Sequence, residues 1–174
     1  MATPPPVTDT LAQFVTKTEF AAISEKALAN AKMHLLDTLG VALAGTREPV
    51  AAIALDYCKR IGPAHESTIW GTKLKAAAPT AAFANGLLAH ALDYDDWDAF
   101  IHVGHPTSML LGAALSVGES TAASGKELLK AYVLGIEVMC KLAANCPNVQ
   151  DRGFHSTPVW GSLGAAVACA ICEK

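Results

Sequence analysis

Charged and aromatic residues are scarce in this chain of 174 residues, at 17% and 6% respectively. The Lys and Arg residues form no run, and the formal net charge is −3, so nucleic acid and anionic membranes are not expected partners. With 52% hydrophobic residues, the chain is also too apolar for a disordered protein. Length and composition together predict one folded domain around a single core.

The sequence has few cysteines and lacks targeting signals. Its five cysteines form an odd and scattered set, which indicates a reducing compartment, and we expect a cytoplasmic protein. Residues 1–6 contain neither the basic nor the apolar region of a signal peptide and are expected to form a disordered leader. The uncharged stretches 99–118 and 153–172 are about as long as a bilayer span, but their His, Pro and Gly residues favour buried helices.

Alanine makes up roughly a fifth of the chain, while β-branched and aromatic residues are comparatively scarce. Because alanine is the best helix former, residues 7–174 are expected to form an all-α domain. No stop signal follows Cys172, which predicts that the chain is a fragment of a longer protein. Residues 67–70 are expected to form a lone strand or an extended connector. Apolar periodicity with start and stop signals predicts helices over residues 7–16, 19–45, 49–61, 79–92, 106–119, 124–143 and 158–172.

Carboxylates and imidazoles gather within sixteen positions, between the fourth and fifth of these helices. One interpretation is an acidic, solvated loop. Another is a metal site with Asp95 and Asp96 as ligands, which His102 and His105 would complete; the spacing does not fit a calcium-binding loop. We expect no metal there, because aspartates at neighbouring positions of a turn would point in divergent directions. The cluster consists of His90, Asp93, Asp95, Asp96, Asp98, His102 and His105.

Two histidines precede predicted helix starts in similar surroundings, in the segments 105–108 (His-Pro-Thr-Ser) and 155–158 (His-Ser-Thr-Pro). Free N–H groups and the positive end of the helix dipole favour an anion there. A histidine beside such an end can bind a carboxylate or move a proton. The alternative interpretation is ordinary N-capping by serine and threonine, with incidental histidines. We expect Asp93, His105 and His155 to converge on one cleft.

These residues resemble the MmgE/PrpD family, which includes 2-methylcitrate dehydratase, cis-aconitate decarboxylase and iminodisuccinate epimerase. The resemblance implies an all-helical domain followed by a smaller α+β lid domain, with the active site between them. It also implies catalysis without a metal or organic cofactor. The matching segments are 81–96, 104–107 and 153–157, supported by 36–40, 44–45 and 69–71.

The resemblance also assigns the site residues. It implies that Asp93, His105 and His155 are catalytic, and that Thr107 takes the place of the motif's hydroxyl residue. At the two helix starts, we expect Thr107 and Ser156 to bind substrate. Trp97 departs from the pattern, because many members have a threonine at that position. The family's catalytic lysine and tyrosine belong to sequence beyond this chain, so we expect the chain to be truncated before the lid domain and inactive alone.

The function implied is that of a lyase acting on a small di- or tricarboxylic acid, such as 2-methylcitrate or cis-aconitate, in carboxylic acid or propionate metabolism. We expect this lyase to be a homodimer. Two other hypotheses remain open. One is a metal-dependent all-helical enzyme that uses the aspartate-rich turn, and the other is a catalytically inactive helical association module.

Overall fold

The computed structural model describes residues 6–98 and 100–173, so nearly all of the predicted leader, residues 1–5, lies outside the described residues. The predicted all-α class is confirmed. Two short strands, β1 (Ser67–Thr68) and β2 (Lys75–Ala76), and two 3-10 turns, η1 (Phe20–Ala22) and η2 (Pro147–Val149), accompany the helices. The α-helices are α1 (Val7–Lys17), α2 (Glu25–Gly45), α3 (Pro49–Ile61), α4 (Ala78–His90), α5 (Pro106–Ser120), α6 (Gly125–Asn145) and α7 (Ser156–Cys172).

Several predicted boundaries are wrong by two residues or more. The helix expected from residue 19 begins only at Glu25, because the Ser24 side chain caps it by accepting a hydrogen bond from Ala27 N at 3.2 Å. Helix α4 ends at His90 and not at Leu92. Helix α7 begins two residues before the proline that was expected to start it.

The segment 67–70 is neither a lone strand nor a plain connector. Its first two residues pair with β2 in an antiparallel hairpin, in which Ser67 lies opposite Ala76. The buried side chain of Asn85 holds the hairpin against α4: its Oδ1 accepts from Trp70 N at 2.9 Å, and its Nδ2 donates to Thr68 O at 3.0 Å. An amide side chain thus satisfies backbone groups that the short ladder leaves unpaired.

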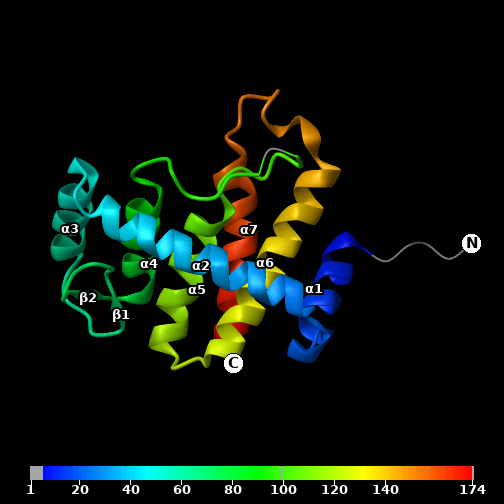
Figure 1. The fold of residues 1–174 in the computed structure, drawn as a ribbon, viewed down its shortest axis with the longest axis horizontal. Helices are drawn as coiled ribbons and strands as arrows, with labels where there is room; N and C mark the ends of the chain where they lie inside the picture. The colour runs from blue at the N-terminus through cyan, green and yellow to red at the C-terminus, as the bar shows by residue number, and fades with distance from the viewer. Residues whose placement is uncertain (1–5, 99, 174) are drawn as a thin grey trace, which may run out of the picture.

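Helix α5 lies at the centre of the fold and packs against α4, α6 and α7 (Figure 1). Its residues Leu110, Leu111 and Ala114 are fully buried. Helix α2 crosses α4, α5 and α6 on one side. The loop from α4 to α5 runs over one end of this bundle, close to the first turn of α7, and carries the polar cluster of the sequence.

Helices α6 and α7 run side by side with closely approaching backbones. A Cβ added at Gly135 would lie 2.9 Å from Gly164 O, and one added at Gly164 would lie 3.0 Å from Gly135 O. Both separations are too short for any larger residue without a shift. Across the part of the chain that is described, no helix combines the length and hydrophobicity needed to cross a membrane.

Candidate active site

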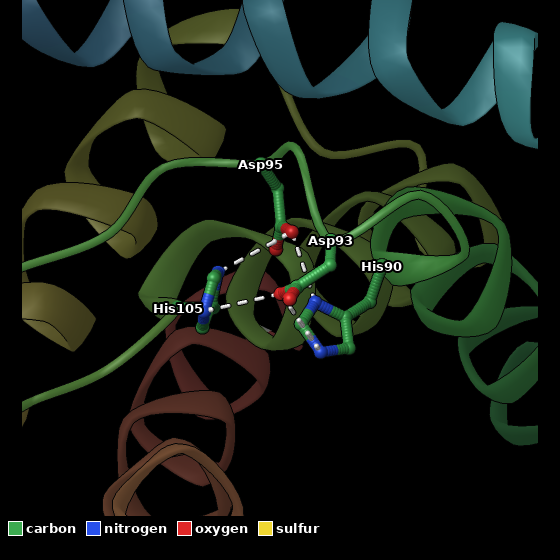
Figure 2. A group of neighbouring side chains, drawn as sticks. All are labelled: His90, Asp93, Asp95 and His105. Atoms are coloured by element: carbon green, nitrogen blue, oxygen red, sulfur yellow. Dashed lines mark hydrogen bonds and ion pairs between the residues drawn. The ribbon is translucent and has the colours of Figure 1, made fainter.

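Four side chains of the cluster point toward one another at the end of the bundle (Figure 2). His90 ends α4, His105 directly precedes α5, and Asp93 and Asp95 lie on the loop between them. One possible ligand atom from each lies within 4.8 Å of the others. The loop turns sharply here, since Asp93 adopts a left-handed φ of 49°, a conformation that aspartate tolerates better than most residues.

Asp95 is the buried carboxylate of the group, with a side chain 0% exposed. Its Oδ1 lies 2.9 Å from Nδ1 of His90 and 3.4 Å from Nδ1 of His105. The two imidazole rings meet edge to face, with centroids 4.7 Å apart. Within the described residues, the buried atoms Oδ2 of Asp95 and Nδ1 of His105 have no hydrogen-bond partner.

Asp93 is the exposed carboxylate of the group, with a side chain 77% exposed. Its Oδ1 lies 3.5 Å from Nε2 of His105 and 4.0 Å from Nε2 of His90. Each imidazole therefore has one nitrogen toward the buried Asp95 and the other toward Asp93, where solvent and small molecules have access.

Asp96 has a different task, although it directly follows Asp95. Its Oδ1 accepts from Thr107 N at 3.1 Å, and its Oδ2 accepts from the Thr107 hydroxyl at 2.6 Å, so it caps the start of α5. The Tyr132 hydroxyl lies 2.6 Å from that of Thr107 and is the donor, because the Thr107 hydrogen goes to the carboxylate. Burial raises the pKa of Asp96 above its ordinary value, against the opposing effects of the Thr107 hydrogen bonds and of His34.

This cap changes the expectation for the first helix start. The start of α5 was expected to attract a substrate carboxylate, but Asp96 already supplies a carboxylate to it. Thr107 is fully buried, and its hydroxyl is engaged by Asp96 and Tyr132. The structure therefore places Thr107 beneath the loop, where it holds Asp96.

Asp98 shapes the loop itself. Its Oδ1 accepts from Phe100 N at 3.0 Å and its Oδ2 from Ile101 N at 3.3 Å, while its own N–H donates to Gly104 O at 2.9 Å. His102 is exposed. Of the metal ligands considered from sequence, the structure brings together only Asp95 and His105. The set that could hold a metal ion includes His90 and Asp93 in addition.

The second histidine-bearing helix start lies directly beside the first. Thr157 Oγ1 accepts a hydrogen bond from His105 N at 3.0 Å, so α7 is tied to the residue that precedes α5. Ser156 is buried, and its Oγ accepts from Gln150 Nε2 at 3.1 Å. His155, the N-cap residue of α7, is exposed.

A pocket of about 420 Å³ opens between α4, α5 and α7, with His90 and His155 on its wall. The remaining lining is mostly apolar and includes Phe83, Leu87 and Met109. The predicted catalytic residues thus lie as follows: Asp93 contacts His105, and His155 shares the pocket with His90, whose ring touches that of His105.

Sequence reasoning noted His90 and Asp95 in the cluster but gave neither a role in the acid chemistry. The sequence does carry a signal for His90, because a residue in the last turn of a helix places its side chain beside the loop that follows. Nothing in the sequence indicated that Asp95 would be buried while Asp93, two positions before it, would be exposed.

The comparisons with known proteins agree with the resemblance. The model of the MmgE/PrpD N-terminal domain matches residues 9–173. Cis-aconitate decarboxylase from human is 33% identical over 169 residues and that from mouse 31% over 172 residues. A cis-aconitate decarboxylase-like protein of Aspergillus oryzae is 29% identical over 171 residues.

These alignments cover 93–94% of this chain but 35% of each relative, so the chain spans about a third of the length of the curated relatives it matches. The family model, in contrast, covers almost every described residue, including all four side chains of the cluster. On that match, the chain belongs to the MmgE/PrpD family.

Proposed function

We propose that the chain forms the histidine–aspartate side of the active site of a lyase that acts on a small di- or tricarboxylate, with cis-aconitate and 2-methylcitrate as the leading substrates and without a metal or organic cofactor. The observation that carries this proposal is the contact between the accessible Asp93 Oδ1 and Nε2 of His105 at 3.5 Å. The names of the relatives support a decarboxylase-type reaction.

The chemistry needs a group that moves one proton at a carbon beside a carboxylate. In a dehydration, a base removes that proton, the C–H electron pair forms the new double bond, and the neighbouring hydroxyl leaves as water as an acid protonates it. In a decarboxylation, the C–C bond to the departing CO2 breaks, its electron pair stays on carbon, and an acid protonates that carbon. An imidazole suits both directions because its ordinary pKa lies near neutral pH.

The geometry suggests a division of roles. We assign the proton transfer to His105, which lies between two carboxylates and is mostly shielded, with its side chain 16% exposed. Asp93 then orients the ring or receives the proton from the accessible side. His155, on the pocket wall, is placed to hold a substrate carboxylate when protonated or to act as a second proton donor.

Binding is the direct test of this proposal. The chain, with its histidines labelled with ¹⁵N, is titrated with cis-aconitate, citrate and 2-methylcitrate, and the imidazole resonances are followed by NMR. We expect weak, saturable shifts of His105 and His155. An exposed anion site at a helix end is worth only about 0.3–1 kcal/mol, so tight binding is not expected.

Two variants sharpen the titration. His105→Ala should weaken the binding, whereas His65→Ala, which changes an exposed histidine between α3 and β1, should leave it unchanged. An equal affinity for the acids in the two variants would contradict the proposal. So would the absence of a saturable shift of His105 and His155 in the unaltered chain.

Turnover is a separate question. We expect the 174-residue chain alone to convert none of these acids, because Asp93 and His90 lie open to water, with side chains 77% and 42% exposed. Water there weakens the interactions that should stabilise the transition state. Chromatography of the incubated acids measures this, and turnover that disappears in His105→Ala would show that the expectation of inactivity is wrong.

A metal-dependent reaction is the second candidate, favoured by the four donor atoms within 4.8 Å. Two imidazoles and two carboxylates form a donor set that suits Zn²⁺ or Mn²⁺. Elemental analysis of the purified chain decides between the two. Stoichiometric metal that is lost in Asp93→Ala would favour this candidate, and its absence would favour the cofactor-independent reaction.

A further inference from the structure

Asp95 takes no part in the proton transfer assigned to His105, yet its carboxyl group is the most deeply buried of the site. A carboxylate withdrawn from water is costly unless hydrogen-bond donors replace the water. The donors that the described residues offer it are Nδ1 of His90 at 2.9 Å and Nδ1 of His105 at 3.4 Å.

We propose that Asp95 is a positioning residue that fixes His90 and His105 in the Nδ1–H tautomer. An ionised carboxylate can only accept hydrogen bonds. Asp95, with a side chain 0% exposed, has no water to replace these donors, so the nitrogen that pairs with it must carry the hydrogen. Asp93, on the Nε2 side, is 77% exposed and is hydrated by solvent, so it makes no such demand, and Nε2 of each neutral ring is left as the free base. The further step, that Nε2 of His105 is the atom that moves the proton in catalysis, rests on the proposed function.

Two buried, unpaired atoms indicate how the contact between Asp95 and His105 becomes a hydrogen bond. Oδ2 of Asp95 and Nδ1 of His105 are both buried, and both lack a hydrogen-bond partner within the described residues. They belong to side chains already in contact, and the torsion that turns a carboxylate group about its Cβ–Cγ bond is soft. A small rotation would let Oδ1 serve His90 and Oδ2 serve His105, and would satisfy both atoms at once.

The neighbouring aspartates cannot take over this task. Both oxygens of Asp96 accept hydrogen bonds from Thr107, and both oxygens of Asp98 accept backbone N–H groups of the loop. Asp93 contacts the opposite nitrogens of the two rings. The two carboxylates therefore have separate roles: Asp95 sets the tautomer from the buried side of the rings, and Asp93 faces their Nε2 atoms.

The consequence for the two rings is directional. Nε2 of His105 and Nε2 of His90 both face the exposed Oδ1 of Asp93, at 3.5 and 4.0 Å. A substrate that exchanges a proton with either ring must therefore approach from the side of Asp93. His90, which sequence reasoning left without a role in the acid chemistry, becomes a second imidazole with the same orientation of its free nitrogen.

The tautomers can be read directly by two-bond ¹⁵N–¹H NMR of the labelled chain at about pH 9, where an unperturbed imidazole is neutral. We expect His90 and His105 to show the Nδ1–H pattern. Exposed His65 should show the Nε2–H pattern that predominates in free histidine. An Nε2–H pattern at either of the two site histidines would overturn the proposal without any variant.

Variants then identify the cause. Asp95→Asn replaces one acceptor oxygen by a donor nitrogen, so we expect at least one of the two rings to change to Nε2–H. Asp95→Glu restores the carboxylate and should retain the Nδ1–H pattern. Asp96→Asn makes the same chemical change one residue later, as a matched control, and should leave both rings unchanged.

Retention of Nδ1–H at both rings in a folded Asp95→Asn protein would overturn the proposal, as would a change caused by Asp96→Asn. Far-ultraviolet circular dichroism checks the fold of each variant, and the unaltered chain gives a decisive result even if Asp95→Asn fails to fold. Because these spectra are taken without substrate, a failure of the proposed function, seen as no binding of cis-aconitate, would leave them unaffected.

Discussion

The hydroxyl of Thr157 accepts a hydrogen bond from the main-chain N–H of His105 at 3.0 Å, across 52 positions of the chain. This bond fixes the backbone of the site histidine to the first turn of α7. Gly104, the residue before His105, packs against the same hydroxyl with a left-handed φ of 87°.

Gly104→Ala should therefore be costly. Its new Cβ would collide with Thr157 Oγ1, in addition to the strain of a positive φ. Gly153→Ala is the matched control, because Gly153 has a similar φ of 84° but no atom within 4 Å of the added Cβ. We expect the control to lower the free energy of unfolding by about 1–2 kcal/mol and Gly104→Ala to lower it by a further 1–3 kcal/mol or so. Equal losses in urea unfolding would contradict the steric argument.

Thr107→Val should destabilise the chain while preserving its shape. The valine leaves Oδ2 of Asp96 and the hydroxyl of Tyr132 without their partner in a buried place, at a cost of about 1–3 kcal/mol. Adding Tyr132→Phe removes the Tyr132 hydroxyl, one of the two polar groups left without a partner. The double variant should then lose less than the sum of the two single losses, whereas additive losses would mean that the two hydroxyls are not coupled.

Asp96→Asn should alter the pH dependence of stability. Burial raises the pKa of Asp96 in the folded state, so the folded chain binds this proton more tightly than the unfolded chain does. Stability is then lost as the pH rises from about 3.9, the ordinary value for aspartate, through the raised folded pKa. The advantage of the unaltered chain over Asp96→Asn should fall across this interval in urea unfolding. The comparison is repeated in a His34→Gln background, which removes the neighbouring imidazole. A stability advantage of the unaltered chain over Asp96→Asn that rises with pH would contradict this prediction.

The helix pair α6–α7 offers a contrast between two glycines. Gly164→Ala should destabilise by about 1–3 kcal/mol, because the added methyl group would meet Met139 and Gly135. Gly40→Ala should stabilise by about 0.5–1 kcal/mol, because Gly40 lies within α2 and nothing lies within 4 Å of the added Cβ. Thermal unfolding measures both, and a change of the same sign in both would contradict the packing argument.

Local chemistry explains why much of the fold could be predicted. Pro49 and Pro106 occupy first-turn positions of α3 and α5, and the capping box of Ser124 and Glu127 begins α6. Such signals act within a few residues, so sequence shows them. Tertiary contacts are not local in this way. The side chains that α6 buries include Tyr132 and Met139, because α5 and α7 contact this helix from directions that periodicity does not reveal.

The cluster shows the limit of spacing arguments more clearly. Four aspartates lie within six positions but have different surroundings. Asp93 faces solvent, Asp95 is buried against two imidazoles, Asp96 caps α5 and Asp98 shapes the loop. Which task each performs depends on Thr107, on His90 and on the path of the loop. These partners are set by tertiary packing, which no local pattern encodes.

Trp97, on the loop that carries the site, gives this loop an optical label. Its side chain is 68% exposed, whereas Trp70 and Trp160, the other tryptophans of the chain, are 8% and 7% exposed. Acrylamide in the solvent should therefore quench one fraction of the emission and spare the rest. The quenchable fraction comes from the residue directly after Asp96, so the intrinsic fluorescence of the unlabelled chain reports on the loop that carries the site.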